Sequence, residues 1–328
     1  MTTAQPNSEK DLFSQIREGF AHVAKHADHV TIDMDALGQY ARDLPAAQPD
    51  NTYDPDHHFV GDNAEDTASY LLAAEAVNFG SAYKGALAEE GLELVNHSIY
   101  FTVTMAMKKH FEDNGVMSAP DMAALTPAQC AKIFGFDTAQ KTHHELNGLF
   151  CGALNHLGQH VQSNYGGKFA RFLESGKGSA KTMLATLAEL PYYNDVHDYK
   201  GRLVPVFKRA QHSLAVIDLE FTRLGQPLFD DRALMTMFAD NAVPHVLRMD
   251  HVLRYSDALA RKIENSELLP SGSAEEVEIR CCAGHAVELI ATLKGVSACD
   301  VDFNLWHRSL EQPHYRTMPS HKTRSIYY

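Results

Sequence analysis

The segment from Leu234 to Pro244 places an acidic side chain at the end of a strongly apolar run. Asp240 follows this run directly, so we expect its carboxylate to lie at the edge of the protein core. A carboxylate buried there without a partner is costly, and its pKa is raised. Because perturbed carboxylates are enriched in active sites, Asp240 is the first candidate for catalysis. The alternative is that Asp240 caps the helix that contains Pro244.

Two adjacent cations, Lys208 and Arg209, follow an apolar segment that ends at Phe207. At the beginning of a helix, such side chains can bind a phosphate together with free backbone N–H groups. The alternative is a basic helix start that only faces solvent. A small anionic ligand needs no more than two or three focused cations, so this pair is a candidate phosphate site.

Two further segments combine acidic and aromatic residues. The C-terminal segment contains Asp302 and the single tryptophan of the chain, Trp306, and the chain closes with T-R-S-I-Y-Y. Most chain termini fray, but one rich in aromatic residues favours docking against the body of the protein. In the N-terminal part, H-H-F-V-G begins at His57, and Glu75 lies in an apolar run that stops at Gly80. Glu75 and the polar turn after it could close one end of a pocket. The alternative is that the turn only ends the helix.

Several short patterns resemble metal or phosphate motifs but are incomplete. His144-Glu145 begins like a zinc-protease helix, yet Gly148 stands where the second ligand would be. Residues 176–182 resemble a phosphate loop, but Ala180 replaces a required glycine and no strand precedes it. Two histidine pairs with the spacing of one helical turn lack a nearby third ligand, namely His22 with His26 and His156 with His160. We interpret all of them as chance matches, and a metal-dependent hydrolase is the last of our hypotheses.

Helical patterning dominates the chain. Ser8 and Asp11 resemble a capping box ahead of apolar residues at three- or four-residue steps from Leu12 to Val23. Strand signals are sparse, and 203–207 is the best, so we predict a mainly α fold with few short strands. A junction near Pro191–Asp198 would divide two halves that share one cleft. The other predicted helices are 31–43, 62–80, 95–113, a helix that starts with Thr126-Pro127, 140–175, 180–189, 208–224, 242–251, 256–268, 274–293 and 300–311.

Composition limits the classes of function. The 328 residues carry a net charge of −13, which disfavours stable binding of nucleic acid. Five cysteines without a C-x-x-C motif indicate a reducing compartment. The polar N-terminus resembles no signal peptide, and no apolar stretch is long enough to cross a membrane. We therefore expect a cytoplasmic protein that acts on a small molecule.

Together these segments resemble the queuosine salvage family, formerly a domain of unknown function. The resemblance runs from His57 to Tyr328 and is densest from Val206 to Tyr255. It implies a domain at 57–328, preceded by helices in 1–56. The motifs that carry it are F-K-R-A-Q at 207–211, T-M-F-A-D at 236–240, Tyr255-Ser256, E-V-E-I-R at 276–280, D-x-x-L-W at 302–306 and the closing T-R-S-I-Y-Y.

The resemblance implies a fold akin to helix-hairpin-helix DNA glycosylases and an enzyme that hydrolyses the N-glycosidic bond of queuosine 5′-phosphate, releasing queuine. It implies that Asp240 is catalytic and that no metal or organic cofactor is needed. The 5′-phosphate would be held by Lys208, with Arg209, Arg280, Lys322 or Arg324 as further candidates. The substrate-binding positions implied or suggested are His57, Phe238, Asp302, Phe303, His307, Lys208 and Arg209.

Some positions differ from the family pattern. Glu75 stands where the family usually has Asp, and His307 stands where some members carry Asp. Asn241, Ala242 and His245 replace the Tyr, Arg and Gln that commonly follow the catalytic aspartate. These differences concern which base the enzyme recognises more than which bond it cleaves. A glycosidase for another modified or damaged nucleotide, and a non-catalytic nucleobase- or DNA-binding module, therefore remain as alternatives.

Overall fold

The computed structural model describes residues 11–46 and 55–328. Within these ranges the chain forms 16 α-helices and two antiparallel sheets of two short strands each. The predicted mainly α fold with few short strands is confirmed. The likeness to helix-hairpin-helix glycosylases stays a prediction.

The elements follow one another along the chain with short connections. The helices are α1 (Leu12–His26), α2 (Met34–Asp43), α3 (Ala64–Ala76), α4 (Lys84–Glu89), α5 (Ile99–Asn114), α6 (Ala119–Ala123), α7 (Pro127–Phe134), α8 (Lys141–Tyr165), α9 (Phe169–Glu174), α10 (Ala180–Ala188), α11 (Lys208–Arg223), α12 (Ala242–Met249), α13 (Asp257–Glu264), α14 (Ala274–Lys294), α15 (Ala298–Glu311) and α16 (Pro313–Thr317). The strands are β1 (Val30–Ile32), β2 (Val196–Tyr199), β3 (Arg202–Pro205) and β4 (Leu253–Tyr255).

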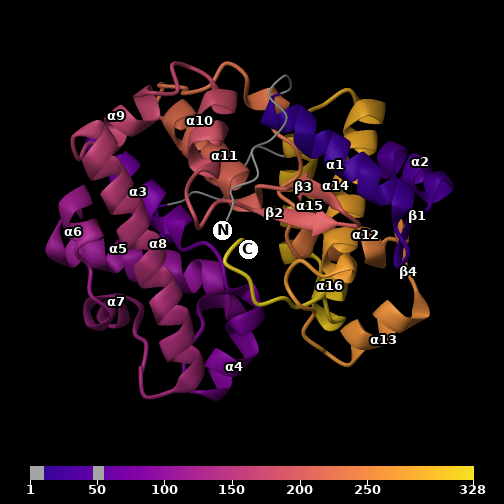
Figure 1. Ribbon diagram of the computed structural model, residues 1–328, viewed down its shortest axis with the longest axis horizontal. Coiled ribbons are helices and arrows are strands. Elements are labelled where there is room, and N and C mark those ends of the chain that lie inside the picture. The colour runs from indigo at the N-terminus through magenta and orange to yellow at the C-terminus, as the bar shows by residue number, and fades with distance from the viewer. Residues whose placement is uncertain (1–10, 47–54) are drawn as a thin grey trace.

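The helices form two lobes (Figure 1). In the first lobe, α3 packs against α5, α8 and α9; in the second, α14 packs against α1, α2, α12 and α15. Helix α11 contacts α3, and the β2–β3 hairpin contacts α1 and α14, so these elements join the lobes. The predicted junction near Pro191–Asp198 falls where the chain passes from α10 into β2.

The N-terminal helices pack on the C-terminal part of the chain. At Gly284 of α14, an added Cβ would meet the Phe20 ring of α1 at 2.4 Å, so the glycine permits a close approach of the two helices. Strand β1 pairs with β4, with Val30 opposite Tyr255. The division of the chain into residues 1–56 and 57–328 therefore remains a prediction about family boundaries rather than about separate packing units.

Local capping signals begin α7 as predicted and begin α1 with a different cap. Thr126 and Gln129 form the capping box at α7, with Pro127 at the first helical position. Asp11 caps α1 by accepting from the Ser14 backbone N–H at 3.1 Å. The predicted box had Ser8 as the cap and Asp11 as its partner three residues later, whereas Asp11 is itself the cap of α1. Ser8 lies outside the described residues.

Several predicted elements differ from the structure. The helices expected at 62–80, 95–113 and 256–268 are shorter, namely α3 (Ala64–Ala76), α5 (Ile99–Asn114) and α13 (Asp257–Glu264). The helix expected at 140–175 is split into α8 and α9, because Gly166 and Gly167 adopt left-handed φ angles of 62° and 75°. The helix expected at 31–43 begins at Met34, because the residues before it pair with β4. The strand expected at 203–207 ends at Pro205, since Phe207 adopts φ 47° as the residue before α11.

The C-terminal tail docks between the lobes, as the aromatic residues predicted (Figure 1). Tyr328 is 3% exposed, and its backbone carbonyl accepts from the Gly80 N–H at 3.1 Å. Arg324 donates to Glu145 of α8 at 3.1 Å and lies over the Tyr83 ring. The tail thus ties the first lobe to the second. Among the described residues, no helix has both the length and the apolar character needed to cross a membrane.

Candidate active site

Asp240 lies at the entry to α12, next to the cation of Lys208. Its Oδ2 is 3.7 Å from Lys208 Nζ, and its Oδ1 accepts from the Ala242 backbone N–H at 2.7 Å. The Asp240 side chain is 17% exposed and that of Lys208 6%. Asp240 therefore accepts from a backbone N–H at the start of α12, as the alternative interpretation required. Its carboxylate is nevertheless partly accessible and has a cation beside it.

The segment 235–240 runs along α11 in the opposite direction. Gln211 and Thr236 exchange hydrogen bonds of 2.9 and 3.0 Å, which fixes the register of the two. Four helical residues rise about 6 Å, and two extended residues span about 6.6 Å. The Lys208–Asp240 pair and the His212–Phe238 pair therefore lie one after the other, one helical turn apart, where α11 faces the 235–240 segment.

Phe238 lies at the centre of an aromatic cluster. Its ring meets the edge of His212 and the ring of Phe303, each at 5.4 Å between centroids and at angles of 84° and 74°. Its backbone N–H donates to Asp302 Oδ1 at 3.0 Å. The structure thus brings five of the predicted site residues together, namely Asp240, Phe238, Asp302, Phe303 and Lys208.

Asp302 is 4% exposed and lies close enough to Asp240 to feel its negative charge. Burial, reinforced by the negative charge of Asp240, raises the pKa of Asp302 well above its usual range. The Phe238 N–H and Lys208 offset only part of this shift. The raised pKa favours the protonated form of Asp302, one oxygen of which accepts from the Phe238 N–H.

A buried ion pair that the sequence analysis did not identify stands on the other side of Phe238. His212 Nδ1 is 2.8 Å from Glu75 Oε2, and Asn78 Nδ2 donates to the same oxygen at 3.2 Å. Glu75 is 2% exposed. The one signal in the sequence was the spacing of four between Lys208 and His212, which places both on one face of α11.

A second buried network lies directly behind the site. Arg280 is 0% exposed and donates to Asp195 at 2.6 Å and to Glu276 at 3.1 Å, with the Tyr328 ring stacked on its guanidinium. Its Nε donates to the carbonyl of Ala239 at 2.7 Å, one residue before the candidate catalytic residue. Arg280 was a candidate for binding phosphate, but two carboxylates already engage its guanidinium group.

The start of α11 is also occupied. The Lys208 backbone N–H donates to Asp195 Oδ2 at 3.1 Å, so a carboxylate of the protein lies where the sequence suggested a bound phosphate. Arg209 is 1% exposed and donates to the backbone carbonyls of Ala76 and Tyr192, between the rings of Phe79 and Tyr193. These contacts argue against a direct contact between Arg209 and a substrate.

The remaining predicted positions have contacts of their own. His57 packs against Phe101 of α5 at 5.0 Å, and α5 adjoins α3, which carries Glu75. His307 lies on α15, one helical turn beyond Phe303. In the tail, the Lys322 carbonyl accepts from the Leu269 N–H at 2.8 Å.

The incomplete motifs have structural roles. Glu145 accepts from the Tyr83 hydroxyl at 2.7 Å as well as from Arg324. In the 176–182 segment, Ser179 caps α10, and the Asp231 carboxylate accepts from the Ala180 N–H where a phosphate would bind. Within the described part of the chain, no three His, Cys, Asp or Glu side chains are grouped as metal ligands would be.

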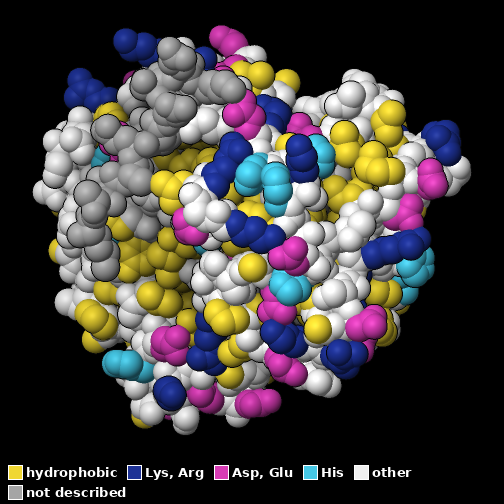
Figure 2. Space-filling view, turned by 45° about the vertical axis from the view of Figure 1, so that its right-hand side comes forward, with side chains coloured by type: hydrophobic (Ala, Val, Ile, Leu, Met, Phe, Trp, Pro, Cys, Tyr) yellow, Lys and Arg dark blue, Asp and Glu magenta, His cyan; other side chains and the backbone are white. Residues whose placement is uncertain are grey.

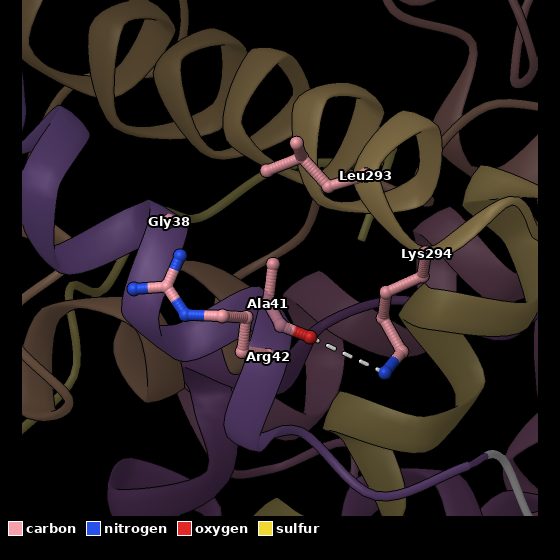
Figure 3. A pocket seen from close by; sticks show the side chains of 5 residues that line it. All are labelled: Gly38, Ala41, Arg42, Leu293 and Lys294. Carbon is pink, nitrogen blue, oxygen red and sulfur yellow. Dashed lines mark hydrogen bonds between the residues drawn. The ribbon is translucent and has the colours of Figure 1, made fainter.

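A separate surface pocket lies between α2 and α14 (Figure 3). Its volume is 280 Å³, and Lys294 on its wall donates to the Ala41 carbonyl at 3.3 Å. None of the residues predicted for the site lines it. The lining residues are Gly38, Ala41, Arg42, Leu293 and Lys294.

Comparison with known proteins agrees with these observations. A family model described as queuosine salvage protein matches residues 57–328. A protein of Sphaerobacter thermophilus named queuosine 5′-phosphate N-glycosylase/hydrolase is 30% identical, with 93% of this chain and 95% of the relative covered. Proteins of the same name from Mus musculus and Dictyostelium discoideum are 31% and 25% identical, with 65% and 95% of this chain and 67% and 98% of the relatives covered. The chain belongs to the queuosine salvage protein family.

Proposed function

We propose that this protein hydrolyses the N-glycosidic bond of queuosine 5′-phosphate and releases queuine. Family membership and the names of the relatives support the reaction. The observation that carries the assignment to a site is the partly exposed Asp240 carboxylate, 3.7 Å from Lys208 and two residues from the aromatic cluster around Phe238.

The reaction breaks the bond between the ribose anomeric carbon and a ring nitrogen of the base. The bonding electron pair leaves with the base, and positive charge develops at the sugar. A carboxylate facing the anomeric carbon stabilises this charge or attacks it, and we assign this role to Asp240. Water supplies a hydroxyl group to the anomeric carbon, and its remaining proton is lost to Asp240 or solvent.

The departing base must gain a proton to be released as a neutral molecule. A 7-deazaguanine lacks the N7 acceptor of a purine, so this help has to come from contacts elsewhere on the base. Burial and the charge of Asp240 raise the pKa of Asp302, which favours a proton on this carboxyl, and we assign to Asp302 the donation of that proton to the base. Queuosine 5′-phosphate and water thereby give queuine and ribose 5-phosphate.

Lys208 is the cation we assign to the sugar–phosphate end of the substrate. Its Nζ lies beside Asp240, whereas the guanidinium groups of Arg209 and Arg280 are engaged by backbone carbonyls and buried carboxylates. His57, Phe303 and His307 complete the proposed pocket, with the tail residues Lys322 and Arg324 as further candidates for the phosphate.

The direct test is to incubate the purified protein with queuosine 5′-phosphate and to measure free queuine and ribose 5-phosphate by chromatography. We expect both products in equal amounts, and Asp240→Asn should lower the rate at least about 1,000-fold while substrate binding persists. Turnover retained by Asp240→Asn would remove Asp240 from catalysis. Because Asn241, Ala242 and Glu75 differ from the family pattern, guanosine and 7-deazaguanosine 5′-phosphates belong in the assay. Preferential cleavage of either would favour the alternative glycosidase.

We further propose that the protein acts in the cytoplasm and binds no nucleic acid stably. All five cysteines are buried thiols, which fits a reducing compartment. On the face shown in Figure 2, Lys and Arg side chains alternate with Asp and Glu rather than forming a broad basic surface. A gel-shift experiment with tRNA and duplex DNA at low salt should show no complex, and a salt-sensitive complex would support the nucleic-acid-binding alternative.

A further inference from the structure

His212 is a half-buried histidine whose two ring nitrogens have different surroundings. Nδ1 lies 2.8 Å from Glu75 Oε2 and 3.4 Å from Asn78 Nδ2. Nε2 forms no hydrogen bond within the described residues, and the side chain keeps 17% of its exposure. One face of the imidazole is thus anchored, and the opposite edge is open.

Glu75 fixes the orientation of this ring. Burial opposes ionisation of Glu75, but the positive charge and hydrogen bond of His212, with help from Lys208 and Asn78, lower its pKa below the usual range. An ionised carboxylate accepts a hydrogen bond, so Nδ1 carries the proton that points at Glu75. A carboxylate behind a histidine sets which nitrogen faces outward, as in other functional sites.

The open edge of His212 lies at the base end of the proposed pocket. His212 follows Lys208 by one turn of α11, and Lys208 marks the sugar end through Asp240. The His212 ring stands edge-on to Phe238, with centroids 5.4 Å apart and an angle of 84°. A heterocycle lying against Phe238 would therefore have a polar edge close to Nε2.

A purely structural ion pair predicts a different environment. If His212 only linked α11 to Glu75 of α3, burial of the whole ring would leave Nε2 either bonded to protein or desolvated at a cost. Instead, the anchored nitrogen faces α3 while Nε2 keeps its hydrogen-bonding capacity next to the aromatic cluster. This asymmetry is what a ligand-contacting histidine requires.

We propose that His212 is a further specificity-determining residue, which contacts the heterocyclic base of the substrate through Nε2 and is held in place by Glu75. The inference rests on the proposed function for the identity of the base. The ligand class it fits is a guanine-like heterocycle with hydrogen-bonding groups along one edge.

Two substitutions separate the roles of the two nitrogens. The amide of Asn lies where Nδ1 lies, so His212→Asn can keep the bond to Glu75 but removes the outward atom. The amide of Gln lies where Nε2 lies, so His212→Gln restores an outward polar group. His285→Asn, at another half-buried histidine on α14, is the matched control.

The experiment measures binding of free queuine and inhibition by ribose 5-phosphate for each variant, together with kcat and KM for queuosine 5′-phosphate. We expect His212→Asn to weaken queuine binding at least about tenfold, the loss typical of one hydrogen bond to a substrate. Inhibition by ribose 5-phosphate should be unchanged, His212→Gln should recover most of the binding, and His285→Asn should resemble the parent protein.

Unchanged queuine binding in His212→Asn would overturn the inference, as would an equal loss of ribose 5-phosphate binding, which would indicate a general disturbance of the fold. The unfolding midpoint of each variant identifies a variant that fails to fold, and in that case recovery by His212→Gln decides. If the parent protein binds queuine but does not cleave the nucleotide, the proposed reaction is wrong, and the comparison of Asn with Gln still decides the contact.

Discussion

Two neighbouring charge clusters, one around Arg280 and one formed by Lys208 and Asp240, differ in how completely they are paired. Arg280 is 0% exposed and bonds Asp195 at 2.6 Å and Glu276 at 3.1 Å. Lys208 and Asp240 are 3.7 Å apart, and the Asp240 side chain is 17% exposed. The first cluster is closed to ligands, whereas the second keeps unsatisfied hydrogen-bonding capacity.

This difference follows from the cost of desolvation. Charges without access to water need several short hydrogen bonds, because removal of one partner leaves the remaining charge buried and uncompensated. A pair that has to admit a substrate cannot be satisfied in this way. The closed cluster also positions the open one, because Arg280 holds the Ala239 carbonyl and Asp195 holds the Lys208 N–H. A rigid network thus supports a reactive pair that it does not neutralise.

Breaking the closed cluster should have the largest effect. Arg280→Met leaves Asp195 and Glu276 buried without their cation, and we expect a loss of about 3–5 kcal/mol in the free energy of unfolding, measured with urea. Arg254→Met is the matched control, since Arg254 is 70% exposed and pairs with Asp33 at the surface, where about 1 kcal/mol or less is expected. Equal losses in the two variants would contradict the distinction drawn between closed and surface pairs.

The closed cluster should also make stability depend on pH through the tail. Burial, with the nearby charges of Arg280 and His245, lowers the pKa of His321 to about 3. The unfolded chain therefore binds one more proton than the folded chain between about pH 3 and 6.5. Stability should fall as the pH falls through this window, by up to about 1.4 kcal/mol per pH unit.

His321→Gln removes this titration and keeps a polar side chain near the Tyr328 hydroxyl. The plot of unfolding free energy against pH should be flatter for the variant than for the parent protein between pH 6.5 and 4. Parallel plots would mean that His321 is not responsible for the acid sensitivity.

Lys208 substitutions sharpen the role of the open pair. Lys208→Met should lower kcat/KM about 10–100-fold, because the charge beside Asp240 is lost, and Lys208→Arg should recover part of it. If Lys208 acts on Asp240, the loss appears in kcat for queuosine 5′-phosphate and for queuosine alike. A rise in KM for the phosphorylated substrate only would instead assign Lys208 to the phosphate.

The smallest effect is expected at the edge of the closed cluster. The Tyr328 hydroxyl donates to Glu276 at 2.9 Å, so Tyr328→Phe removes one hydrogen bond to a charged group and should cost about 1–2 kcal/mol. Because the aromatic ring remains over Arg280, activity should stay within about twofold at 25 °C. A large loss of activity in a folded variant would show that the tail acts on the site more directly.

Much of this protein is determined by short stretches of sequence. The Thr126 capping box, the apolar periodicity of α1 and the aromatic ends of the tail rely on contacts within a few residues or on bulk hydrophobicity, so all three were predictable. The motif around Asp240 identified the family by the same means. The break between α8 and α9 was missed because apolar spacing continues across Gly166 and Gly167.

Only the tertiary structure decided which side chains share the site. Glu75 and His212 are 137 positions apart, and nothing local in either segment indicates the partner. Lys208 and Arg209 are adjacent in sequence, yet one helical residue turns the side chain by about 100°, so Lys208 faces Asp240 while Arg209 enters the protein interior. The sequence determines the helices because the contacts that form them are local. The tertiary structure determines which side chains pair, because pairing depends on distances that the whole fold sets.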